Sequence, residues 1–145
     1  MVGFPGETEG DFRLSIQAAE EFGFSHIHTF KYSVRHGTRA EHMPGQIPEK
    51  EKTRRSEIIR NLSGKMKSDY RRTFTGRKQT VLVEQFDERG FATGYGEHYV
   101  PVIIREKGLE KNKFYTVIIS GIERENEPLL VGETTSINPK VNYGG

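Results

Sequence analysis

Two tyrosines and a histidine share a short glycine-containing stretch in the second half of the chain. The stretch reads Gly94-Tyr95-Gly96-Glu97-His98-Tyr99 and follows a run with the pattern of a β-hairpin. Glycines free the backbone to bend, and tyrosines offer flat, partly polar rings that can stack on unpaired nucleic-acid bases. The same tyrosines could instead cap the core of a small barrel, and their spacing alone favours neither interpretation.

Basic side chains are concentrated immediately before this stretch. Residues 48–79 hold 11 Lys/Arg against 4 Asp/Glu, whereas residues 1–47 hold 4 against 6 and residues 80–145 hold 7 against 10. A localised positive charge attracts polyanions, although a solvated helix face has the same composition. If this part of the chain contacts RNA, six basic side chains are expected to hold its phosphates. They are Arg71, Arg72, Arg77, Lys78, His98 and Arg105.

A second pair of chemically capable residues is His26 and His28, which are separated by one residue. In a strand the two imidazoles would lie on the same face and could bind a metal ion. Only His36 and His42 are nearby, and no carboxylate companion is evident. Ordinary packing or a substrate contact is therefore favoured over a metal site, and we predict none.

The composition limits the chemistry available within the chain. Its 145 residues contain no cysteine, which excludes disulfides, thiolate nucleophiles and cysteine-ligated iron–sulfur or zinc sites within it. No apolar run approaches the roughly 20 residues needed to span a bilayer. The first residues lack the charged and apolar regions of a signal peptide. We expect a folded cytoplasmic protein with no membrane partner.

The first part of the chain has the pattern of strand–helix units. Thr8 and Asp11 form a helix-capping signature, and apolar residues then recur at helical spacing, which predicts a helix over residues 9–22. Residues 24–30 are expected to form a strand. A strand end, a helix and a strand in this order imply parallel pairing in an α/β sheet or barrel.

A long charged helix and five short strands are predicted after these units. The helix is expected from Glu49 to about Tyr70, with Ser63-Gly64 as a point where it could kink. Five strands in about 55 residues favour a small antiparallel barrel of the oligonucleotide-binding kind. The predicted strands cover residues 79–85, 91–95, 100–105, 114–122 and 129–133, with turns at 87–90, 111–113 and 125–128.

The motifs taken together resemble a known family. VGFPGET followed by a helix, then SHIHTFKYSVRHGT, MPGQIP and a basic helix, is similar to the carboxyl-terminal end of the radical-SAM barrel in methylthiotransferases. VLVEQ, GYGEHYVPV and LVGET resemble the TRAM domain that closes those enzymes. The loop is most similar to the transfer-RNA-modifying branches, in particular the one acting on N6-threonylcarbamoyladenosine beside the anticodon. Lys31 and His36 depart from the family, which usually has proline there.

The resemblance implies an α+β chain that is a carboxyl-terminal fragment, because the cluster-binding cysteines of the family are missing from it. Residues 1–70 would be the last strand–helix units of the radical-SAM barrel. Residues 71–135 would form the TRAM barrel, an antiparallel five-stranded barrel of the oligonucleotide-binding type, and residues 136–145 a flexible tail. A partial barrel of this kind is expected to pack irregularly or to self-associate, exposing or sharing Ile27 and Phe30.

The resemblance also implies a function. The whole enzyme would use S-adenosylmethionine and two 4Fe–4S clusters to methylthiolate C2 of a modified adenosine in tRNA, whereas this chain would bind no cluster and be inactive alone. Near S-adenosylmethionine the resemblance places Gly3, Glu7, Tyr32, Ser33, Arg35 and Thr38. The TRAM barrel would hold the tRNA anticodon stem-loop through Arg71, Arg72, Arg77, Lys78, Tyr95, His98, Tyr99 and Arg105. A free-standing RNA-binding module without a catalytic role is the alternative.

Overall fold

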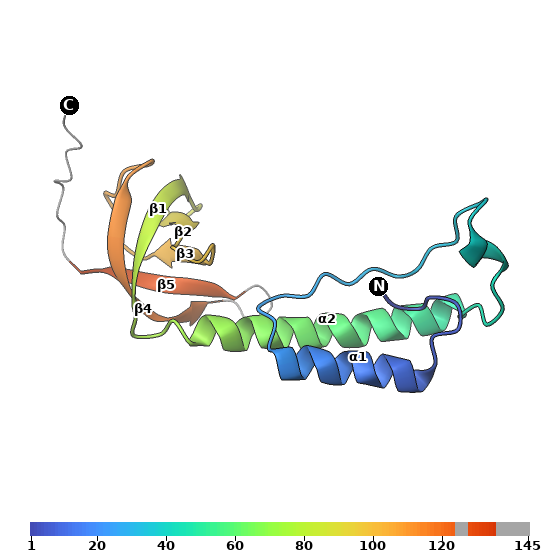
Figure 1. Ribbon diagram of the computed structural model, residues 1–145. Helices are drawn as coiled ribbons and strands as arrows, with labels where there is room; N and C mark the ends of the chain where they lie inside the picture. Colours follow the sequence, from blue (N-terminus) through green and yellow to red (C-terminus); the bar gives the residue numbers. More distant parts are fainter. Residues whose placement is uncertain (124–127, 136–145) are drawn as a thin grey trace, which may run out of the picture. The chain divides into compact units, whose positions relative to one another are not determined.

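A computed structural model describes residues 1–123 and 128–135 (Figure 1). The chain divides into two compact units, Met1–Lys67 and Ser68–Gly145. The helical elements are α1 (Glu9–Phe22), a short 3-10 helix η1 (Arg39–His42) and α2 (Glu49–Arg72), whose last turn belongs to the second unit. The strands are β1 (Lys78–Phe86), β2 (Ala92–Tyr95), β3 (Pro101–Ile104), β4 (Phe114–Glu123) and β5 (Leu129–Thr134).

Helix α1 begins and ends where the sequence predicts. The Thr8 hydroxyl accepts a hydrogen bond from the Asp11 backbone at 3.1 Å, and the Asp11 carboxylate accepts one from the Thr8 backbone at 2.9 Å. This reciprocal pair is a capping box, which satisfies N–H groups that have no partner within the helix. Gly23 ends the helix with a left-handed backbone, at φ 62°. The helix predicted over residues 9–22 is confirmed.

The strand predicted over residues 24–30 is wrong. The only ladder contact at this segment is one parallel bridge between Val2 and Lys31. Val2 donates its N–H to Phe30 O and accepts from Tyr32 N, both at 2.8 Å. After Val2 the chain bends through the Pro5-Gly6 turn toward α1, so no strand accompanies residues 24–30 along their length. The first unit therefore contains no sheet, and the predicted barrel piece is not seen in it.

Helix α2 continues without interruption through Ser63-Gly64, where a kink was expected. Pro48 precedes it and accepts hydrogen bonds from the N–H groups of the first turn. Within the first unit, α2 packs against α1 (Figure 1), and Ile59 shares a core with Val2 and Phe12. This core is small, and the same helix face also buries polar and charged side chains. They are Lys52, Arg55, Ser56 and Ser63.

The five strands of the described residues close into a barrel in the order β1-β2-β3-β5-β4. The predicted small barrel is therefore confirmed. Its description as antiparallel is wrong for one pair, because β3 and β5 run parallel while the other neighbours are antiparallel. The reason is geometric: an odd number of strands cannot alternate in direction all the way round a closed ring. One parallel pair is the minimum that closure requires.

Side-chain alternation along the strands fills the barrel with apolar residues. On β1, Val81 and Val83 are buried, and they share a core with Val102, Val117 and Leu130 from other strands. The β1–β2 turn at residues 87–90 is formed as predicted, with Asp87 N–H bonded to Phe91 O at 2.9 Å. The turn predicted at 125–128 lies largely outside the described residues, and the predicted tail, 136–145, lies wholly outside them.

No helix within residues 1–123 and 128–135 combines the length and apolar character needed to cross a membrane.

Barrel closure makes Gly94 intolerant of a side chain. A Cβ at Gly94 would lie 1.8 Å from Leu82 O, whereas a Cβ at Gly121 on β4 would meet nothing within 4 Å. We expect Gly94→Ala to destabilise the barrel by about 3 kcal/mol or more, because the backbones must separate to admit the methyl group. Gly121→Ala should change stability by less than about 1 kcal/mol. Equal thermal melting curves for the two variants would contradict this account.

Candidate nucleic-acid interface

The loop between β2 and β3 presents two tyrosines to solvent. Gly96 N–H donates to Val100 O at 3.0 Å, and Tyr99 N–H donates to Gly96 O at 3.1 Å, which makes a tight turn. Val100 is buried in the barrel core, whereas Tyr95 is 43% exposed and Tyr99 is 87% exposed. The interpretation in which these tyrosines cap the core is therefore wrong, and both rings are accessible to a partner.

Aromatic rings are grouped around this loop. The rings of Tyr95 and Tyr99 lie 5.7 Å apart, with an angle of 42° between their planes. His98 stands 5.4 Å from Phe74, whose ring in turn meets Tyr70 edge-on at 5.2 Å. Phe74 is part of the buried core, so it forms a fixed surface against which the exposed His98 packs. The structure thus brings together three residues that were predicted to contact RNA: Tyr95, His98 and Tyr99.

Tyr99 occupies an unusual backbone conformation. Its φ is 56°, in the left-handed region that favours glycine. For a residue with a side chain this conformation costs roughly 1–2 kcal/mol. The two hydrogen bonds that close the turn hold Tyr99 there, so the strain sits at the most exposed ring of the loop.

The predicted phosphate-binding residues near the start of the barrel differ in accessibility. Arg72, Arg77 and Lys78 are exposed, whereas Arg71 is only 9% exposed. Arg72 lies 3.5 Å from Asp69 in a solvent-exposed pair, which binds the arginine only weakly. The accessible positive charge of this segment therefore comes from residues 72, 77 and 78.

Arg105 is separated from the tyrosine loop. The β2–β3 register pairs Tyr95 with Pro101 at one end and Ala92 with Ile104 at the other. Arg105 follows Ile104, so it lies about 10 Å or more away along the strands at 3.3 Å per residue. There Glu123 accepts a hydrogen bond from its guanidinium at 3.0 Å. Arg105 thus belongs to an ion-pair group at the other end of β2, and its RNA contact stays a prediction.

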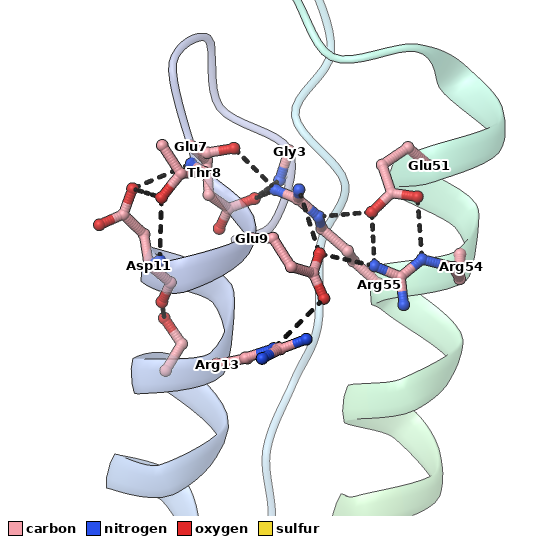
Figure 2. Close-up of polar contacts among 10 residues, drawn as sticks. Gly3, Glu7, Thr8, Glu9, Asp11, Arg13, Glu51, Arg54 and Arg55 are labelled. Atoms are coloured by element: carbon pink, nitrogen blue, oxygen red, sulfur yellow. Dashed lines mark hydrogen bonds and ion pairs between the residues drawn. The ribbon is translucent and has the colours of Figure 1, made fainter.

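Two of the residues expected near S-adenosylmethionine contact each other in the first unit (Figure 2). One oxygen of the Glu7 carboxylate accepts from Gly3 N–H at 2.6 Å and from Arg55 Nη1 at 2.7 Å. Arg55 is 5% exposed, and it also donates to Glu7 O at 3.0 Å and to Glu51 at 2.9 Å. The Glu7 carboxylate therefore takes part in an internal ion pair that fastens the loop before α1 onto α2.

Arg55 and Glu51 each shift the other's pKa in the direction that favours its charged form. Burial acts to lower the pKa of Arg55, but hydrogen bonds to Glu7 and Glu51 outweigh it and the pKa is raised. Arg54, followed by Arg55, lowers the pKa of Glu51 to about 2. Sequence reasoning did not find Arg55. Its spacing of four from Glu51 indicates a helix pair, but no local signal connects it with Glu7, 48 positions away.

The other four residues of the predicted cofactor group follow the bridge at Lys31. Tyr32 is buried, with its ring 5.3 Å from Phe4, and its hydroxyl has no hydrogen-bond partner among the described residues. Ser33, Arg35 and Thr38 are exposed in the following loop. The Thr38 hydroxyl donates to Arg35 O at 2.8 Å, which shapes that loop.

The two histidines of the extended segment meet edge-on rather than as neighbours on a strand. The rings of His26 and His28 are 4.3 Å apart, and the Ser63 hydroxyl of α2 lies 3.3 Å from His26 Nδ1. Within the part of the chain that the structure describes, His, Asp and Glu side chains form no group of three or more placed to hold a metal ion.

Comparison with known proteins shows which enzymes the chain is similar to. No protein-family model matches the chain. The threonylcarbamoyladenosine tRNA methylthiotransferase of Thermotoga maritima is 37% identical over 100 residues, which is 69% of the chain and 23% of that protein. The tRNA-2-methylthio-N(6)-dimethylallyladenosine synthase of Pelotomaculum thermopropionicum is 36% identical over 137 residues, or 94% of the chain and 27% of that protein. The chain is related to the tRNA methylthiotransferases.

The resemblance read from the motifs is thereby confirmed at the level of the tRNA methylthiotransferases. The chain spans about a quarter of the length of these relatives and matches their carboxyl-terminal part. A synthase of the dimethylallyladenosine type from Magnetococcus marinus is also similar, at 44% identity over 58% of the chain and 19% of that protein. Both substrate branches of the methylthiotransferases are thus represented among the relatives.

The methylthiotransferase relationship raises the question of iron–sulfur clusters, which these enzymes are expected to carry. Thiolates are the usual ligands of such clusters, and this chain contains no cysteine. The residues present here therefore do not fit a cluster.

The lowered pKa of Glu51 predicts an acid-sensitive first unit. Because the folded-state pKa of about 2 lies below the ordinary 4.5, the stabilisation is complete above pH 4.5 and is lost as pH falls toward 2. We expect Glu51→Gln to flatten the decline of unfolding free energy across this range, measured by urea titration at each pH. Glu57→Gln, an exposed change on the same helix, is the control and should keep the wild-type slope. Parallel slopes for both variants would contradict the role of Glu51.

Proposed function

We propose that this chain is the RNA-holding, carboxyl-terminal part of a tRNA methylthiotransferase. The observation that carries the proposal is the similarity to such enzymes over 94% of the chain. The exposed pair Tyr95 and Tyr99 supports it, because binders of unpaired nucleic acid combine stacking rings with nearby cations. The exposed Arg72, Arg77 and Lys78 of the same unit are candidates for the cations. The partner would be a tRNA anticodon stem-loop, and the protein would act in the cytoplasm.

The complete enzyme would methylthiolate C2 of a modified adenosine next to the anticodon. We favour the threonylcarbamoyl-modified adenosine, because the chain's tyrosine loop resembles that branch and the Thermotoga maritima relative carries that name. S-adenosylmethionine and iron–sulfur clusters would supply the methyl group and the radical chemistry, with every cluster ligand coming from outside these 145 residues.

The first unit would border S-adenosylmethionine. Of the residues expected there, Tyr32 has a buried hydroxyl without a hydrogen-bond partner among the described residues. Glu7 is already bound by Arg55, so its contribution would be to hold the Gly3 loop in shape. If the chain were instead a free-standing RNA-binding module, its first unit would have no S-adenosylmethionine site beside it. The match to methylthiotransferases extends over both units, which favours the enzyme part.

RNA binding tests the proposal through two kinds of variant. We expect Tyr99→Ala to weaken binding of a labelled anticodon stem-loop by about five- to a hundredfold, the usual range for loss of one stacked base, at an unchanged salt slope. The double change Arg72→Ala, Arg77→Ala should instead reduce the slope of log affinity against log salt by one to two units. Fluorescence anisotropy at several salt concentrations measures both quantities.

The matched control for charge is Arg13→Ala with Arg60→Ala, which removes two exposed cations from the first unit. This variant should keep the wild-type salt slope. The proposal fails if the wild-type chain binds the stem-loop no better than a fully paired hairpin, or if Tyr99→Ala leaves affinity unchanged.

The cysteine count predicts that the chain has no cluster chemistry of its own. Anaerobic reconstitution with iron and sulfide should give no cluster absorbance, and addition of reductant and S-adenosylmethionine should give no 5′-deoxyadenosine. The Thermotoga maritima relative, treated in parallel, is the positive control. Appearance of that product from this chain would show that the assignment of cluster ligands to another part of the enzyme is mistaken.

A further inference from the structure

A row of side chains crosses three neighbouring strands on the outside of the barrel. Leu82 on β1 pairs in register with Tyr95 on β2 and with Phe114 on β4. Directly opposed residues of neighbouring strands point to the same face of a sheet. Because Val81 and Val83, on either side of Leu82, point into the core, all three residues point outward. We call Tyr95, Leu82 and Phe114 the outer row.

The outer row is accessible and continues along β4. Phe114 is 67% exposed, more than Tyr95, and Leu82 lies half-buried between them. Ile118, four residues after Phe114, is also exposed and pairs in register with Lys78. A contiguous group of exposed apolar side chains on a folded barrel marks an interaction surface, since it adds nothing to the core.

The spacing of the row suits nucleic-acid bases. Strands lie about 4.8 Å apart, so Tyr95 and Phe114 stand about 10 Å apart on either side of Leu82. Sheets that bind single-stranded RNA use aromatic side chains on adjacent strands to stack two or three bases. Here the two rings are on strands separated by β1. The row therefore offers two aromatic faces separated by one aliphatic residue.

The charges around the row are of both signs, and the lysines among them are candidates for phosphate contacts. The outward positions along β1 and β4, on the side of the row toward Lys78, are Lys78, Thr80, Thr116 and Ile118, and Ile118 pairs in turn with the exposed Glu133 of β5. Lys113, exposed, immediately precedes Phe114 and lies on the opposite side of the row from Lys78, because its carbonyl accepts a hydrogen bond from Val83 N–H at 3.0 Å. The next outward residue of β1 beyond Leu82 is Glu84, which stands at the β-bulge on the opposite side of the row. A phosphate backbone would therefore be held at the two lysines, Lys78 on one side of the row and Lys113 on the other, and kept away from Glu84 and Glu133.

We propose that the outer row is a base-stacking surface for unpaired RNA, with one base on Tyr95, one on Phe114 and phosphates held by Lys78 and Lys113. The partner class rests on the proposed function. The inference goes beyond it by extending the interface from the tyrosine loop across β1 to β4. Tyr95 belongs to both surfaces, so a single strand of RNA would pass from Tyr99 over Tyr95 to Phe114.

The test is Phe114→Ala in the full chain, with a labelled oligouridylate and the anticodon stem-loop as probes. Affinity for both should fall about fivefold or more, as for loss of one stacked base. Phe86→Ala is the matched control, because Phe86 is an exposed phenylalanine at the far end of β1, opposite Ala92. It should change affinity less than twofold. Phe114→Tyr keeps the ring and should retain binding, which separates the loss of stacking from damage to the fold.

The outcomes distinguish this inference from the proposed function. If Tyr99→Ala weakens binding while Phe114→Ala does not, the outer row is not an RNA surface, although the proposed function stands. If Phe114→Ala weakens oligouridylate binding but the chain does not prefer the stem-loop to a fully paired hairpin, the tRNA role fails and the outer row stands. If Phe114→Ala only converts a dimer to a monomer in sedimentation, the row is a self-association surface and the inference is overturned.

Discussion

The close approach of two backbones at Gly94 is the constraint on which the barrel depends. Leu82 O occupies the space that a side chain at Gly94 would need, so β1 and β2 can pair closely only because this residue has no Cβ. The pairing fixes the register, and the register sends Val83 inward and Tyr95 outward. Exposure of the tyrosine is thus a direct result of packing inside the barrel.

In the basic segment, residues 48–79, some cations are paired within the protein and others are exposed to solvent. Lys52, Arg54 and Arg55 form ion pairs with glutamates of the first unit, and Arg55 is buried among them. A buried guanidinium must be paired because an isolated charge is costly to remove from water. These cations are therefore unavailable to a polyanion, and the net charge counted from the sequence overstates the attraction. Other cations of the segment stay exposed, and those nearest the barrel are Arg72, Arg77 and Lys78.

Local patterns predicted the local features well. The capping box at Thr8 and the barrel strands were found because each depends on residues close in sequence. The strand at residues 24–30 was predicted wrongly, since a strand exists only with a neighbour and Val2 alone supplies one. The parallel β3–β5 pair was missed because closure is a property of the whole ring rather than of any segment.

The residues of the candidate sites were likewise predictable only where they are close together in the sequence. The glycine–tyrosine loop was visible in the sequence because its residues are consecutive, and exposure then decided between stacking and core packing. The Glu7–Arg55 pair could not be predicted, because it joins residues 48 positions apart. The outer row was equally hidden, since Leu82, Tyr95 and Phe114 become neighbours only once the register of three strands is known.

The left-handed backbone of Tyr99 sets stability and recognition against each other at a single residue. Glycine would adopt φ 56° without cost, yet the chain places there one of its largest side chains, almost fully exposed and contributing little to the core. Natural proteins commonly give up some stability at the positions where they meet a partner. In this barrel the trade-off is confined to one turn, so the strands beneath it can be optimised for stability without altering the surface that the turn presents.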